Sequence, residues 1–184
     1  MNLLCTTLII LVAGLVVISV AKIFINIHRN IKDQESFDKR YKVSFDKHFK
    51  KVKVPLIKMK IGGNLKYFIV DSGAESNILA TDFFESLDPK YITQSDIEAQ
   101  LISAEGSSAK ASVVHIDLSF KKEKYPSIPF LVTKLVDATE WIQENTKICI
   151  AGILGSEFFA RYKWLIDFDE RCIWVSQLDK EENE

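Results

Sequence analysis

The carboxylate of Asp71 is the group best placed to do chemistry in this 184-residue chain. Asp71 directly follows the apolar residues 67–70 and precedes Ser72 and Gly73. A carboxylate at the end of a buried strand needs hydrogen-bond partners. The Ser72 hydroxyl can supply one, and Gly73 can bring its backbone N–H close because it has no side chain. By itself, however, an Asp-Ser-Gly tripeptide is most often only a capped turn after a strand.

A pair of such carboxylates could hydrolyse an amide bond without a metal and without a covalent intermediate. Two carboxylates held about 3 Å apart share a proton, because they cannot both ionise. The ionised member then activates a water as general base, and the protonated member polarises the scissile carbonyl. The chain has one Asp followed by Ser or Thr and then Gly, since neither Asp167 nor Asp169 has this context. If the chain is an enzyme that uses such a pair, the second carboxylate must come from a second chain, which a symmetric dimer supplies.

Other chemistries find no matching residues in the sequence. Ser72 and Ser76 have no His in a recognisable pattern, and there is no G-x-S-x-G, no HExxH and no phosphate-binding glycine loop. Cys149 and Cys172 belong to no CxxC pair, which argues against a zinc site and leaves open free thiols or one bridge between them. We therefore expect no metal and no cofactor.

Two segments resemble the retropepsin-like aspartic proteases. The run from Phe68 to Leu79 resembles the active-site segment of that family. Downstream, residues 152–155 (Gly-Ile-Leu-Gly) with residues 156–159 resemble its second motif, in which an apolar pair and a Gly pack beneath the catalytic loop and open a short helix. The resemblance spans about residues 52–176.

The resemblance implies roles for six positions. They are Asp71 as the catalytic aspartate, Ser72 and Gly73 as its support, and Ala74, Glu75 and Gly106 as substrate-binding residues, with Gly106 in the tip of a flap. One position departs from the retroviral pattern, because Ser156 stands where those enzymes often have Arg. The departure removes a possible ion partner of Glu75.

The elements that must position these residues are mostly short strands. Apolar or alternating segments bounded by turn residues predict strands at residues 52–61, 65–70, 109–120, 128–132, 148–154, 164–168 and 172–175. Residues 101–104 form a hairpin with the strand at 109–120, and helices are predicted at 80–87, 156–162 and 137–145, where Asp137 can act as the cap. Together with the resemblance, this pattern predicts a mainly-β domain over residues 51–178. We expect it to be a retropepsin-like closed barrel, equivalent to half of an acid protease, with one or two short helices. Residues 135–146 look like an insertion relative to the smallest members of that family.

The two ends of the chain have a different character. Residues 3–21 contain no charge and no proline, and nineteen helical residues span roughly 28 Å, close to the hydrocarbon core of a bilayer. We predict a transmembrane anchor over residues 1–25, in contact with lipid through residues 3–25, with a cleaved signal peptide as the alternative. A basic juxtamembrane stalk over residues 26–50 and an acidic tail over residues 179–184 complete the organisation.

The distribution of charge favours one membrane topology and argues against one class of partner. Residues 22–60 carry a net charge of +8, which favours a single-pass membrane protein with the following domain in the cytoplasm. Residues 61–184 carry −9, which argues against a nucleic-acid partner. The leading hypothesis is a membrane-anchored, homodimeric aspartic endopeptidase that cleaves polypeptides with an Asp71 pair. The alternatives are a catalytically silent binding or assembly module with the same fold, and an unrelated small β domain.

Overall fold

The computed structural model describes residues 18–102 except 30–39, together with residues 108–177, and divides the chain into two units, Met1–Arg40 and Tyr41–Glu184. In the first unit, residues 18–29 form a helix whose larger apolar side chains are exposed. Among the described residues, none of the helices is both long and apolar enough to cross a membrane. Most of the predicted anchor, part of the stalk and the acidic tail lie outside the described residues.

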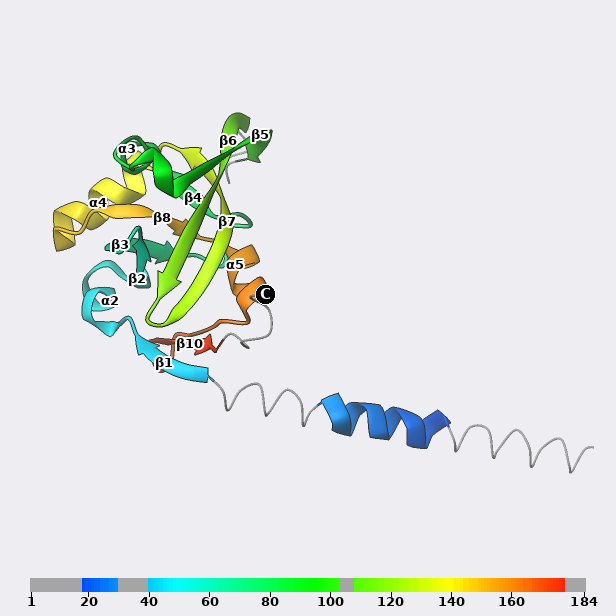
Figure 1. The fold of residues 1–184 in the computed structure, drawn as a ribbon. Helices are drawn as coiled ribbons and strands as arrows, with labels where there is room; N and C mark the ends of the chain where they lie inside the picture. The colour runs from blue at the N-terminus through cyan, green and yellow to red at the C-terminus, as the bar shows by residue number, and fades with distance from the viewer. Residues whose placement is uncertain (1–17, 30–39, 103–107, 178–184) are drawn as a thin grey trace, which may run out of the picture. The chain divides into compact units, whose positions relative to one another are not determined.

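The second unit is built mainly of strands (Figure 1). Its strands are β1 (Arg40–Ser44), β2 (Leu56–Ile61), β3 (Asn64–Val70), β4 (Ile78–Ala80), β5 (Ile92–Ile102), β6 (Ser108–Phe120), β7 (Glu123–Thr133), β8 (Ile150–Leu154), β9 (Leu165–Asp167) and β10 (Cys172–Ser176). Its helices are α2 (Asp46–Val52), α3 (Thr81–Glu85), α4 (Val136–Thr146) and α5 (Ser156–Tyr162), with a 3-10 turn, η1 (Pro89–Tyr91). The mainly-β prediction is confirmed, although the helices in this unit outnumber the one or two expected.

Six strands close into a barrel in the order β2-β3-β8-β4-β7-β6, because β2 also pairs with β6 at Lys60 and Ser119. The predicted closed barrel is therefore present. β5 extends the sheet from β6 as an additional strand, and β1, β10 and β9 form a separate three-stranded sheet. A turn at Gly62 and Gly63 joins β2 to β3 with φ values of 55° and 84°, which suit glycine.

The ends of helices α2 and α4 add detail to the sequence analysis. Phe45 at the N-cap of α2 and Val52 at its last position are 4% and 1% exposed, so both belong to the buried core of the unit that begins at Tyr41. Helix α4 begins at Val136 with Leu135 at its N-cap, so Asp137 lies inside the helix instead of capping it.

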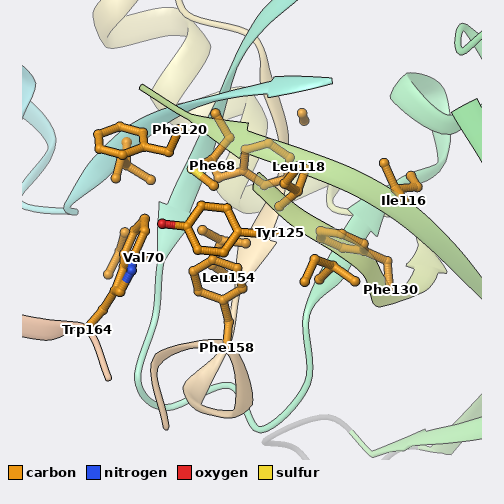
Figure 2. Close-up of a cluster of buried hydrophobic side chains, with 14 of the residues drawn as sticks. Phe68, Val70, Ile116, Leu118, Phe120, Tyr125, Phe130, Leu154, Phe158 and Trp164 are labelled. Carbon is orange, nitrogen blue, oxygen red and sulfur yellow. The ribbon is translucent and has the colours of Figure 1, made fainter. Parts of the chain in front are cut away.

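The core of the barrel is rich in aromatic side chains, as Figure 2 shows. Tyr125 of β7 lies at its centre, with ring centroids 5.5 Å from Phe158, 4.7 Å from Tyr162 and 5.7 Å from Trp164. Phe68 of β3 packs against Phe130 of β7 at 6.0 Å. These contacts fix β3 and α5 to the same core, and the loop between Val70 and β4 is consequently held at both of its flanks.

Candidate active site

The parallel pairing of β3 with β8 determines where Asp71 lies. Val70 is in register with Leu154, and the next backbone N–H, that of Asp71, donates to the Leu154 carbonyl at 3.1 Å. Neighbouring parallel strands end at the same edge of a sheet, so the Asp-Ser-Gly segment and the second motif meet there. Val70 and Leu154 are buried, whereas Asp71 is exposed just beyond the barrel.

The loop after Asp71 folds back on its carboxylate. The Gly73 N–H donates to Asp71 Oδ1 at 2.8 Å, and the Ala74 N–H donates to the Asp71 carbonyl at 3.3 Å. The contact expected of Gly73 is thus present. Ser72 is exposed beside the carboxylate. One face of the Asp71 side chain is held by the backbone, and the side chain remains open to solvent or to a partner.

Helix α5 begins directly on this loop. The Ser156 N–H donates to the Ala74 carbonyl at 2.7 Å, and the Glu157 N–H donates to the Glu75 carbonyl at 3.1 Å. These N–H groups belong to the first turn of a helix, where they have no partner within the helix. The Ser156 hydroxyl, at the position where the retroviral enzymes often have Arg, also donates to the Glu75 carbonyl, at 3.4 Å. Ala74 and Glu75 therefore support α5 through their backbone, while the Glu75 side chain is exposed.

The glycines of the second motif allow a close approach of two backbones. A Cβ on Gly155 would lie 2.5 Å from the Ser76 carbonyl oxygen and 2.8 Å from that of Ala74. A Cβ on Gly152 would lie 2.1 Å from the Ile78 carbonyl oxygen. No side chain fits at either position, which explains why the packing of this motif beneath the loop needs glycine.

Asn77 belongs to the candidate site and was not identified in the sequence analysis. Its side chain is 2% exposed; Oδ1 accepts from the Gly155 N–H at 3.0 Å, and Nδ2 donates to the Pro129 carbonyl at 3.1 Å. The amide thereby connects the loop to β7 and to the start of α5. The signal available in the sequence was a polar residue immediately before the apolar strand Ile78–Ala80. An amide that is buried at such a position needs hydrogen-bond partners.

A cleft of about 370 Å³ adjoins Asp71 and Ser72. Its other walls are mostly apolar. They are Val54, Pro55, Ile69, Val70, Trp141, Ile142, Ile153, Ile166 and Phe168, with Lys53 as a charged residue. The cleft therefore places one carboxylate beside a surface that suits apolar side chains. Gly106 lies outside the described residues, on the connection between β5 and β6.

The remaining candidates from the sequence lie elsewhere. Cys149 and Cys172 are both free thiols; Cys172 is buried, whereas Cys149 is exposed. In the part of the chain that the structure describes, no group of three or more His, Cys, Asp or Glu side chains is arranged to hold a metal ion.

Comparison with known proteins relates this geometry to a family. No curated protein sequence matches the chain. The chain is similar to the crystal structure of a retropepsin-like aspartic protease from Rickettsia conorii, with a TM-score of 0.49 and 16% identity over 74% of this chain and 89% of that one. The sequence matches the family described as aspartyl protease over residues 57–158, which is more than half of the chain. That segment contains Asp71, Asn77 and Gly155. The chain belongs to the aspartyl protease family.

Proposed function

We propose that the chain is an aspartic endopeptidase whose active site forms when two copies bring their Asp71 carboxylates together. The observation that carries the proposal is the position of Asp71, which leaves the barrel at the end of β3 with Oδ1 held by Gly73 and with an apolar cleft beside it. A carboxylate in such a position is expected in an enzyme of this family, and the cleft offers room for a substrate side chain.

The need for a second copy follows from the number of carboxylates at the site. Asp71 is the sole carboxylate among the described residues that line the cleft. One ionised carboxylate can accept a proton from water, but a second, protonated group is needed to polarise the scissile carbonyl. A twofold axis beside Asp71 would supply it, because a symmetric dimer places the same residue on both sides of the axis.

The reaction then requires only the two carboxyl groups and water. The ionised Asp71 takes a proton from the water as the water oxygen adds to the carbonyl carbon, while the protonated Asp71 of the second copy donates to the carbonyl oxygen. Breakage of the C–N bond follows, and a proton passes to the leaving nitrogen. Ser72, exposed beside the carboxylate, and the Gly73 N–H would keep the pair oriented.

The test is the Asp71→Asn variant of the full chain, with Asp169→Asn in the β9–β10 turn as the matched control. The first variant should lose cleavage of a peptide library between about pH 4 and 7, while its circular dichroism and unfolding midpoint stay unchanged. The control should cleave as the wild type does. Undiminished cleavage by Asp71→Asn would refute the proposal, and a wild type that cleaves nothing would favour the silent binding or assembly module.

We also propose that residues 3–25 tether the domain to a membrane, with the domain in the cytoplasm. Support comes from the uncharged run at residues 3–21, the basic residues that follow it, and the exposure of Ile23, Phe24 and Ile25 in the helix at 18–29 (57%, 70% and 60%). Replacing Val12 and Val16 with Arg should release the full chain from vesicles in flotation, because each Arg costs about 3 kcal/mol near the middle of a bilayer. Equal flotation of the variant and the wild type would contradict the tether.

A further inference from the structure

We propose that Trp141 of α4 determines substrate specificity by selecting a large apolar side chain next to the scissile bond. The proposal rests on the proposed function, because the cleft that Trp141 lines is the one that contains Asp71 and Ser72. Helix α4 corresponds to the stretch that looks like an insertion, so this wall of the cleft is a feature of this chain beyond the two motifs.

One wall of the cleft is formed by β3 and β8, the paired strands that precede Asp71 and Gly155. Ile69 and Ile153 are in register on β3 and β8, and Ile69 lies two residues before Asp71. An apolar side chain seated on these two residues would belong to a substrate residue close to the scissile bond. Trp141 would then cover that side chain from the α4 side.

Helix α4 holds Trp141 in place through its neighbour, Ile142. The Ile142 side chain is 1% exposed and packs in a cluster with Leu56, Ile69 and Ile150. The helix ends at Thr146, and the N–H of Lys147, its C-cap, donates to the Gln143 carbonyl at 2.8 Å. Trp141 is thus attached to a backbone that the barrel core positions, and a tryptophan has only two side-chain torsions to fix on binding.

Exposure shows that the Trp141 surface is available. The side chain is 45% exposed although it is among the largest apolar groups in the chain, and Phe168, which also lines the cleft, is 56% exposed. A substrate side chain packed against an exposed ring removes apolar area from water and can form an aromatic pair. Lys53 is the cation at this cleft, and it would favour an acidic side chain instead. The apolar residues outnumber it, so we commit to an apolar occupant.

The experiment compares peptides that differ only at the residue on the N-terminal side of the scissile bond, with Phe, Leu, Ala or Glu there. In the full chain, Trp141→Ala should lower kcat/KM about tenfold for the Phe and Leu peptides and less than about twofold for the Ala peptide. Trp141→Phe should recover most of the loss. Leu65→Ala removes a side chain of similar exposure (57%) outside the cleft and should change none of the ratios.

An equal loss for all peptides, or a wild-type preference for the Glu peptide, would overturn the inference. A second readout does not depend on cleavage. In the Asp71→Asn variant, an uncleavable reduced-amide peptide with Phe at that position should shift the indole N–H resonance that Trp141→Phe removes. An unshifted indole resonance overturns the inference. A shifted resonance in a protein whose wild type cleaves no peptide would support the binding of an apolar side chain at Trp141 and refute the proposed protease activity.

Discussion

Replacing Asn77 with alanine tests how the loop that follows Asp71 is held. The wild-type amide makes two hydrogen bonds, one to the buried Gly155 N–H at 3.0 Å and one to the partly buried Pro129 carbonyl at 3.1 Å. Alanine leaves both backbone groups without this partner. An unsatisfied buried donor costs about 1–3 kcal/mol, and the second, partly buried bond adds about 0.5–1.5 kcal/mol. The expected loss in the free energy of unfolding is therefore about 1.5–4.5 kcal/mol.

Urea unfolding of the full chain measures this loss. With a slope of about 2 kcal/mol per M, the midpoint of the Asn77→Ala variant should lie about 1–2 M below that of the wild type. Asn145→Ala is the matched control, because the Asn145 amide donates to the Trp141 carbonyl at 2.8 Å at an exposed position. We expect the control to remain within about 0.5 kcal/mol of the wild type. A change of the same small size in Asn77→Ala would refute the role assigned to the buried amide.

Three further perturbations follow from the same structure. Gly155→Ala keeps an allowed backbone, because its φ is −90°, but the new Cβ would meet the Ser76 carbonyl oxygen at 2.5 Å. We expect cleavage to fall about a hundredfold through misplacement of the loop. The control is Gly63→Ala, at φ 84° with open space around it, which should cost about 1 kcal/mol of stability and keep cleavage. Equal kcat/KM for Gly155→Ala and the wild type would contradict the close approach of Gly155 to the Ser76 carbonyl. Burial raises the pKa of the Cys172 thiol, whereas Cys149 is exposed, so N-ethylmaleimide should label Cys149 much faster than Cys172 in the folded protein. Mass spectrometry of the peptides measures both rates, and equal labelling of the two thiols would contradict this prediction. Burial and the nearby Lys47, Lys58 and Lys51 hold the pKa of His48 below its ordinary 6.5, so the unfolded state binds the proton more readily. Stability should therefore fall as pH drops from about 7 through 6.5 toward the lower folded-state pKa, and His48→Gln should remove this part of the pH dependence in urea unfolding; an unchanged slope would contradict it.

The sequence analysis singled out the Asp71 segment and the second motif because the signals of both are local. Residues 67–70 of β3 and the whole of β8 are apolar runs, followed by Asp71-Ser72-Gly73 and by Gly155. Each run predicts a buried strand with a polar or tight turn after it. The structure brings these two turns together by the parallel register of Val70 and Leu154. Their meeting could be expected from the resemblance alone, since nothing in either run specifies its partner.

Other elements were missed because tertiary contacts decide them. β5 begins at Ile92, whereas the sequence suggested a strand only from Leu101, because Thr93 and Gln94 are both exposed and the run shows no apolar face. It is a strand because it pairs with β6, with Ile92 opposite Ile116. Phe45 likewise lies in a polar stretch that looks like a stalk, and its burial becomes evident only from its packing against Phe49 and Phe168.

The role of Asn77 could not be derived for a similar reason. An Asn at the end of a loop most often satisfies its own turn, as the Asp88 side chain does by accepting from the Lys90 N–H at 3.1 Å. The partners of Asn77 are instead 78 and 52 residues away in the sequence, at Gly155 and Pro129. A single sequence gives no distance between such positions.

The central claim is that Asp71 of one chain acts together with Asp71 of a second, and mixing the wild type with the Asp71→Asn variant tests it most directly. Full-length chains are combined at constant total concentration, allowed to exchange subunits, and assayed for peptide cleavage. If only the dimer with two Asp71 carboxylates is active, an equimolar mixture retains about one quarter of the wild-type rate, because about one dimer in four has both. A rate of about one half, falling linearly with the wild-type fraction, would show that each chain works alone and would contradict the claim.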